Sequence, residues 1–117
     1  METGRAGCKM TGSAHSPPAM IRHTVVFRLK HALDSDAERD FLRAACELAS
    51  IPGVKQFECL RQTSAKNPYT FGLSMEFDSE AEYASYSSHP EHDAFVQQRW
   101  IPEVAEFMEI DYAPHAP

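Results

Sequence analysis

The stretch YTFGLSMEF, residues 69–77, has the most regular strand pattern in the chain, and the fold prediction starts from it. Apolar side chains at positions 69, 71, 73, 75 and 77 alternate with Thr70, Gly72, Ser74 and Glu76. Because successive side chains of a strand point to opposite faces, this strand has one fully apolar face and one smaller, more polar face. The apolar face needs helices to cover it, and the other face is suited to contact with a second sheet.

Three further strands and two helical regions flank that stretch. β-branched and aromatic residues predict strands over residues 21–30, 54–63 and 104–112, and residues 64–68 have the composition of a turn. Helices are predicted over residues 34–49 and 79–87, and a continuation from Pro90 to Trp100 is expected to end at Pro102. The order β-α-β-β-α-β predicts a ferredoxin-like α+β fold, in which an antiparallel four-stranded sheet carries its helices on one face.

Such a sheet leaves its second face bare, and here that face is too mixed in polarity for a solvated face. Its predicted members are Thr24, Val26, Gly72, Ser74, Met108 and Ile110. We therefore expect a homodimer that forms through sheet-to-sheet packing of two copies.

Helix starts are marked by residues that satisfy free backbone N–H groups. Ser35 and Glu38 have the spacing of a capping box, and Ser79 and Glu82 repeat it. His89 precedes Pro90 and is interpreted as the N-cap of the continuation.

Composition limits the function classes. The chain has 117 residues, of which 43% are hydrophobic and 24% charged, as expected for one globular domain. A net charge of -6 without a basic stripe argues against nucleic acid and anionic membranes as partners. The three cysteines lack the spacing of a disulfide frame or zinc site, so Cys46 and Cys59 are predicted to be small buried thiols in a cytoplasmic protein. Residues 1–19 are interpreted as a disordered leader, and residues 20–117 as the domain.

Proton chemistry is most plausible around residues 86–95, YSSHPEHDAF, where a tyrosine, two histidines and two acids gather. Histidine titrates nearest to neutral pH and is the natural general base. A metal site is the alternative, with ligands from His89, Glu91, His92 and Asp93, which His23, Glu109 or Asp111 could join. The histidines lack the His-Glu-x-x-His spacing, so no metal and no cofactor are predicted.

In its whole order of segments the chain resembles the stress-responsive dimeric A/B barrel (Dabb) domains. The resemblance covers residues 21–112 and is carried by the segments RHTVVFRLK (22–30), IPGV (51–54), FDS (77–79), YSSHPEH (86–92) and DY (111–112). It implies that two ferredoxin-like sheets pair into a dimeric α/β barrel, with a small pocket between the sheet and helices of each subunit.

Within that family the chain is similar to olivetolic acid cyclase, which closes a linear polyketide by aldol condensation. The resemblance implies that Tyr86 and His92 are catalytic, that His23 lines the pocket, and that Asp111 corresponds to an acid on the last strand. The chain departs from the cyclase at Phe71, where that enzyme has a histidine. It departs also at Ala45, which stands near the position of an aromatic residue that helps the cyclase to bind an alkyl tail. At Glu109 the cyclase has an apolar residue. The cyclase's substrate is therefore not carried over.

The predicted function is cofactor-free proton transfer on a small carbonyl or phenolic ligand, of the cyclase, isomerase or lyase type. His92 is the predicted base, Asp111 orients its ring, and Tyr86 donates a hydrogen bond to the developing oxyanion. The predicted substrate-binding residues are His23, Val25, Phe27, Phe41, Phe71, Leu73, Phe95, Phe107 and Glu109. Two alternatives remain: a His92–Asp111 bond that only tethers the last strand, and a non-catalytic, stress-linked module for ligand binding or assembly.

Overall fold

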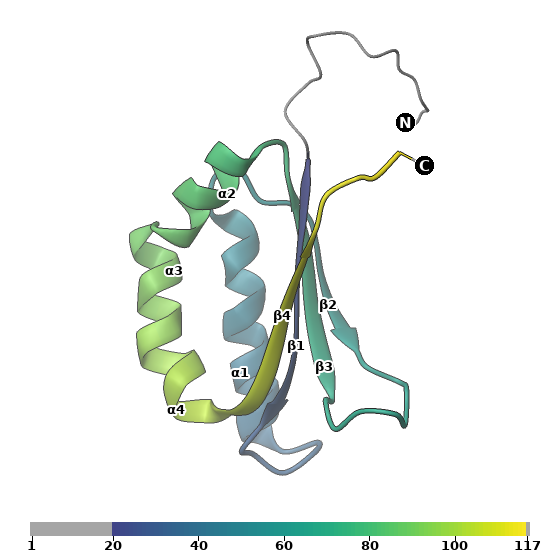
Figure 1. Cartoon of the computed structure of the whole chain (residues 1–117). Helices are drawn as coiled ribbons and strands as arrows, with labels where there is room; N and C mark the ends of the chain where they lie inside the picture. Colours follow the sequence, from purple (N-terminus) through teal and green to yellow (C-terminus); the bar gives the residue numbers. More distant parts are fainter. Residues whose placement is uncertain (1–19, 117) are drawn as a thin grey trace, which may run out of the picture.

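The computed structural model describes residues 20–116, so the predicted leader lies outside the described residues. Its four strands form one antiparallel sheet in the order β2-β3-β1-β4. The strands are β1 (Ile21–Leu29), β2 (Lys55–Arg61), β3 (Phe71–Phe77) and β4 (Val104–Tyr112). All helices cover the same face of this sheet and leave the other face open (Figure 1). The ferredoxin-like prediction is confirmed.

The helical layer consists of one continuous helix and one interrupted region. The helix α1 (Asp36–Cys46) ends in the 3-10 turn η1 (Glu47–Ser50). The interrupted region comprises α2 (Glu80–Ser87), α3 (Pro90–Phe95), the π-helical turn η2 (Val96–Trp100) and α4 (Ile101–Glu103). Within the described residues, no helix has both the length and the apolar character needed to span a membrane.

The predicted N-cap residues are confirmed at the starts of α1, α2 and α3, but the reciprocal half of each capping box is not formed: Glu38 Oε1 accepts from the N–H of Asp34 instead of Ser35, and the buried Glu82 Oε1 has no hydrogen-bond partner among the described residues. The Ser35 hydroxyl accepts a hydrogen bond from the backbone N–H of Glu38, and the Ser79 hydroxyl accepts one from Glu82. His89 caps α3, because its Nδ1 accepts from the N–H of Glu91 at 3.1 Å. This histidine therefore has a structural task.

The helix end at Pro102 was predicted wrongly. The helical path continues through Pro102 to Glu103, and β4 begins directly afterwards. The π turn before Pro102 explains the difference. Its hydrogen bonds run from residue i to residue i−5, as from the Ile101 N–H to the Val96 carbonyl, and the last short helix then has its proline in the first turn, where the missing N–H costs nothing.

The two cysteines also differ from expectation. Both Cys46 and Cys59 are exposed residues, because Cys46 ends α1 and Cys59 lies on the edge strand β2. Desolvation of the sulfur, with Cys46 beside it, still raises the pKa of the Cys59 thiol to about 11. This thiol is therefore protonated at neutral pH and a poor nucleophile.

The core lies between the sheet and the helices. Its largest fully buried side chains are Phe27, Phe41, Phe77 and Met75. The phenyl rings of Phe27 and Phe41 lie 5.9 Å apart and both contact Trp100. This aromatic block fixes α1 and η2 over the centre of the sheet, whereas β4 at the sheet edge stays largely uncovered.

Candidate functional site

A cavity of about 310 Å³ lies between the sheet and the interrupted helical region. Most of its wall is apolar. The apolar residues that line it are Val25, Leu48, Leu73, Met75, Phe95, Val96, Trp100, Ile101 and Phe107. His23, Tyr86, His92 and Glu109 complete the wall, so the few polar groups are all of kinds that can exchange or orient a proton.

The structure sorts the predicted site residues into two groups. Eight of them line the cavity: His23, Val25, Leu73, Tyr86, His92, Phe95, Phe107 and Glu109. Phe27, Phe41 and Phe71 do not, because they are packed into the aromatic core. Asp111 does not line the cavity either, and it lies behind His23. Whether the lining residues bind a ligand stays a prediction.

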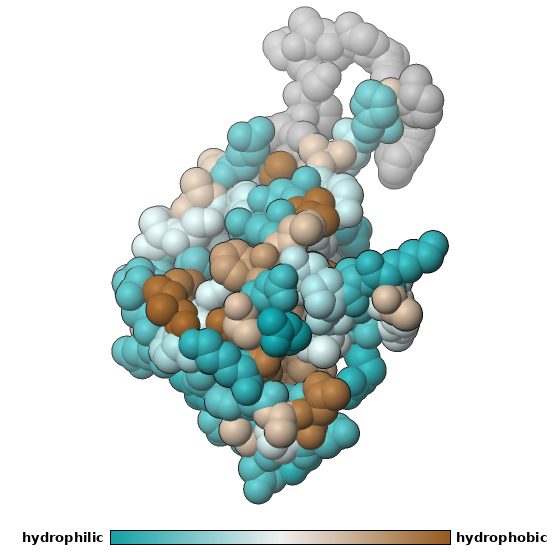
Figure 2. All heavy atoms as spheres, turned by 60° about the horizontal axis from the view of Figure 1, so that its bottom comes forward, coloured by the Kyte–Doolittle hydropathy of each residue, from teal (hydrophilic) through white to brown (hydrophobic). Residues whose placement is uncertain are grey.

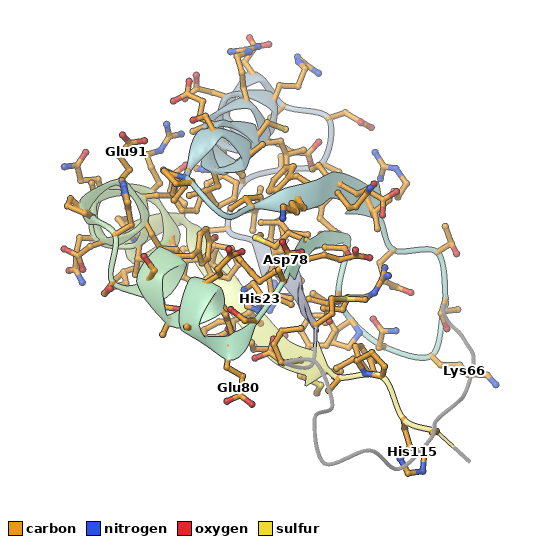
Figure 3. The ribbon with its side chains drawn as sticks, turned by 90° about the horizontal axis from the view of Figure 1, so that it is seen from above. His23, Lys66, Asp78, Glu80, Glu91 and His115 are labelled. Carbon is orange, nitrogen blue, oxygen red and sulfur yellow. The ribbon has the colours of Figure 1, made fainter. Side chains whose placement is uncertain are left out.

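His23 sits at the centre of the polar end of the cavity. It is only 6% exposed and lies between the sheet and the helices, whereas Glu80 and Glu91 lie at the periphery (Figure 3). The register of β1 on β4 sets His23 opposite Asp111 and Val25 opposite Glu109. The His23 Nδ1 lies 2.6 Å from Asp111 Oδ1, and Glu109 Oε2 lies 3.6 Å from the same nitrogen.

The predicted partner of Asp111 was therefore wrong. Its carboxylate bonds to His23 on the neighbouring strand, not to His92 on α3. The reason is the strand pairing: both His23 and Asp111 lie on the helix-facing side of adjacent strands, at directly paired positions.

Tyr83 belongs to this cluster and was missed. Its hydroxyl donates to Asp111 Oδ2 at 2.8 Å and lies 3.0 Å from His23 Nδ1. The ring stacks on Phe77 at 5.2 Å between centroids, which fixes its position. The available signal was the i, i+3 spacing of Tyr83 and Tyr86, which puts both rings on one side of α2.

His92 and Tyr86 form the other half of the polar end. Their ring centroids are 4.6 Å apart, and Tyr86 is buried. Burial lowers the pKa of His92, against a hydrogen bond to the Ser87 backbone that raises it. Burial, with the charge of Glu109, raises the pKa of Tyr86. At neutral pH the imidazole of His92 is therefore a free base and the phenol of Tyr86 a proton donor.

Among the described residues, one group has the composition of a metal site, and it lies at the polar end of the cavity around His23. Ligand atoms of His23, Glu109 and Asp111 all lie within 4.8 Å of one another. The acids are exposed, and the Nδ1 that would coordinate an ion is the one bonded to Asp111. The geometry is that of a hydrogen-bonded cluster.

Comparison with known proteins gives a family for this chain. The model of the stress responsive A/B barrel domain family (Dabb) matches residues 21–114. A Dabb protein with a ferredoxin-like fold from Mesorhizobium loti is 56% identical, with a TM-score of 0.83 over 84% of this chain and 99% of that one. A stress-response A/B barrel domain-containing protein of Arabidopsis thaliana is 24% identical over 92% of this chain. The chain spans 42% of the length of that relative.

Two further structures share the fold at lower identity. A dimeric ferredoxin-like protein of unknown function from Thermobifida fusca is 24% identical, with a TM-score of 0.70 over 90% of this chain and all of that one. A hydroxynitrile lyase from Passiflora edulis is 18% identical, with a TM-score of 0.75 over 86% of this chain and 98% of that one. At these identities the similarity concerns the fold alone.

Proposed function

The chain belongs to the stress-responsive A/B barrel (Dabb) domain family, and from that premise we propose that its cavity binds a small carbonyl compound and transfers a proton on it. The candidate reactions are isomerisation, aldol-type bond formation or cleavage, and decarboxylation, all without a cofactor. The observation that carries the proposal is the meeting of His23, Tyr86 and His92, with Glu109 beside them, at one end of a mainly apolar cavity. A cavity of about 310 Å³ is at the lower limit for small-molecule sites, so the ligand is small.

His92 is the proposed base. Because its pKa is lowered, it is unprotonated at neutral pH and able to take a proton from carbon or oxygen. Glu109 favours the protonated ring, so it stabilises the imidazolium once the proton has moved.

Tyr86 is the proposed hydrogen-bond donor. Its raised pKa keeps the phenol protonated, and its ring lies against that of His92. The base and the donor therefore lie close enough to act on neighbouring atoms of one ligand. The phenol would stabilise the negative charge that develops on the carbonyl oxygen.

His23 is the proposed second proton carrier, and Asp111 is its orienting acid. Asp111 and Tyr83 occupy the Nδ1 side of the ring. Because His23 itself lines the cavity, the arrangement favours Nε2 as the atom presented to a ligand. In this proposal Asp111 orients His23 instead of His92.

We further propose that the protein acts as a homodimer through the open face of the sheet. The relative from Thermobifida fusca is dimeric. In the present chain that face exposes Met108 by 48% and Ile110 by 39%, with Tyr112 on the same strand and Leu60 on the opposite edge strand. Apolar side chains at this density on one sheet face are typical of an interface.

The test is hydrogen–deuterium exchange of the methyl protons of acetophenone in D₂O, followed by proton NMR. This readout detects proton abstraction next to a carbonyl before the natural substrate is known. We expect the protein to accelerate exchange, His92→Ala to reduce the rate by about 10²-fold or more, and Tyr86→Phe to reduce it by about 10²-fold. His115→Ala, which alters an exposed histidine near the carboxyl end of the described residues, is the control.

Two results would change the conclusion. Binding of acetophenone without any exchange would favour the non-catalytic ligand-binding module. Loss of folded protein in His92→Ala, with Tyr86→Phe unimpaired in exchange, would identify His92 as structural. A hydroxynitrile belongs in a second round of substrates, because a lyase for such compounds has the same fold.

A further inference from the structure

The charges around the cavity are all of one sign. Glu109 lines the wall, and Asp111 lies behind His23. No lysine or arginine is among the residues of the described chain that line the cavity. The cluster therefore sets two acids, Glu109 and Asp111, against one histidine, His23.

The arginines on the strand β1 and the π turn, which both contribute residues to the cavity wall, are paired elsewhere. Arg99, on the π turn, donates to Glu103 Oε2 at 2.6 Å and to Asp40 Oδ2 at 2.9 Å. Arg22, on β1, points to the open face of the sheet and pairs with Glu76. Neither guanidinium is placed to neutralise an anion inside the cavity.

The field of Glu109 reaches the place where a ligand's head group would lie. Its charge contributes to the raised pKa of Tyr86 and favours the protonated form of His92. Both effects have the same sign, because a nearby negative charge disfavours a second one. A ligand that arrived with a carboxylate would meet this field without a compensating cation.

The geometry points to a cavity that selects uncharged ligands, with Glu109 at its wall as the residue that excludes carboxylates. This inference rests on the proposed function and narrows its substrate to a neutral ketone, aldehyde or related compound with one polar head and an apolar body. Decarboxylation then drops out of the candidate reactions, because its substrate is an anion. Isomerisation and aldol-type chemistry remain, since both begin from a neutral carbonyl.

The probes are acetophenone and benzoate, which have similar size and shape but differ by one negative charge. The reporter is the indole N–H resonance of Trp100, the only tryptophan of the chain, whose side chain lines the cavity. Titrations at low salt and neutral pH give both dissociation constants from the shift of this signal. We expect benzoate to bind about tenfold more weakly than acetophenone, as expected for one partly exposed charge at close range.

Glu109→Gln is the diagnostic variant, because it removes the charge and keeps the shape. It should reduce the preference for acetophenone over benzoate, taken as the ratio of the two dissociation constants, from about tenfold to about one. Glu106→Gln is the matched control. It alters an acid on the same strand that faces the open side of the sheet and pairs with Arg28, so both constants should stay unchanged.

Each outcome is decisive. Equal binding of the two probes to the parent protein overturns the charge selection and leaves the proposed binding site intact. A preference for acetophenone that persists in Glu109→Gln overturns the role of Glu109. If neither probe moves the Trp100 signal of a folded sample, the binding site of the proposed function fails, and the inference fails with it.

Discussion

Removal of the Tyr83 hydroxyl tests the polar cluster most directly. Tyr83→Phe deletes one oxygen and keeps the ring stacked on Phe77. A hydrogen bond to a charged group contributes about 1.5–3 kcal/mol to stability. Because the Asp111 side chain is 35% exposed, water replaces part of the lost interaction, and we expect the free energy of unfolding to fall by about 1 kcal/mol.

A double-mutant cycle separates this bond from other effects of the substitution. Tyr83→Phe, Asp111→Asn and the double variant are unfolded in urea at one fixed protein concentration, since a dimer's stability depends on concentration. With a slope of about 1–1.5 kcal/mol per molar urea, the midpoint of Tyr83→Phe should fall by about 0.7–1 M. The expected coupling between the two sites is about 1 kcal/mol, well above the scatter of independent sites.

Tyr69→Phe is the control for the cycle, because Tyr69 lies in the segment before β3 and away from Asp111. Its coupling to Asp111→Asn should be zero within about 0.4 kcal/mol. If the coupling between Tyr83→Phe and Asp111→Asn is also zero within about 0.4 kcal/mol, the hydrogen bond is refuted. The idea that Tyr83 and Asp111 hold the His23 ring is then refuted as well.

Three other predictions concern pH, assembly and the ion pairs of Glu103 at the start of β4. Because burial lowers the pKa of His92, the unfolded state binds the extra proton, so stability should decrease as pH falls below about 6.5, and less so in His92→Gln, as measured by urea unfolding across pH. Ile110→Glu should convert the proposed dimer to a monomer in light scattering, whereas the exposed Glu80→Gln should not; a dimer that persists in Ile110→Glu would contradict the proposed interface. Glu103 bonds to Arg99 and His31, and the Arg99 bond is the main reason that its pKa is lowered. Glu103→Gln should therefore lose about 1 kcal/mol at neutral pH by thermal unfolding; that difference should shrink as pH falls below about 4.3 and vanish once pH lies below the lowered pKa of Glu103.

Elements that depend on local sequence were predictable. The alternation at residues 69–77 identified β3 and its buried face, and the two serine caps gave the starts of α1 and α2 within two residues. His89 was recognised as a cap because a cap and a following proline are neighbours in sequence. These features need no knowledge of how distant segments meet.

Features that depend on register were not predictable. Which histidine Asp111 contacts is decided by the pairing of β1 with β4, and the pair that forms is 88 residues apart in sequence. Similarly, Phe27 and Val25 share one strand face, yet only Val25 lines the cavity. Phe27 is kept from the cavity because the π turn places the ring of Trp100 against it.

The exposed hydrophobic residues at one end of the molecule also depend on how distant segments meet. At the end of the molecule where β1 finishes and α4 begins, separate hydrophobic patches lie among hydrophilic side chains (Figure 2). Ile101 and Phe107 are both exposed and both line the cavity. Ile101 belongs to α4 and Phe107 to β4, and a helix predicted only as far as Trp100 does not include Ile101. The mouth of the cavity is therefore a product of the extra helical residues before β4.

The edge position of β4 has a consequence for how long the polar cluster persists. Both acids of the cluster are carried by this strand, which is paired on one side only and is covered little by helices. Edge strands open locally at a lower free energy than the whole domain unfolds, and their amides exchange with solvent earlier. Each such opening would withdraw Asp111 and Glu109 together and leave His23 on the central strand β1 without its carboxylates. A second subunit docked on the open face would slow that opening, so association would increase the fraction of time for which the cluster is complete.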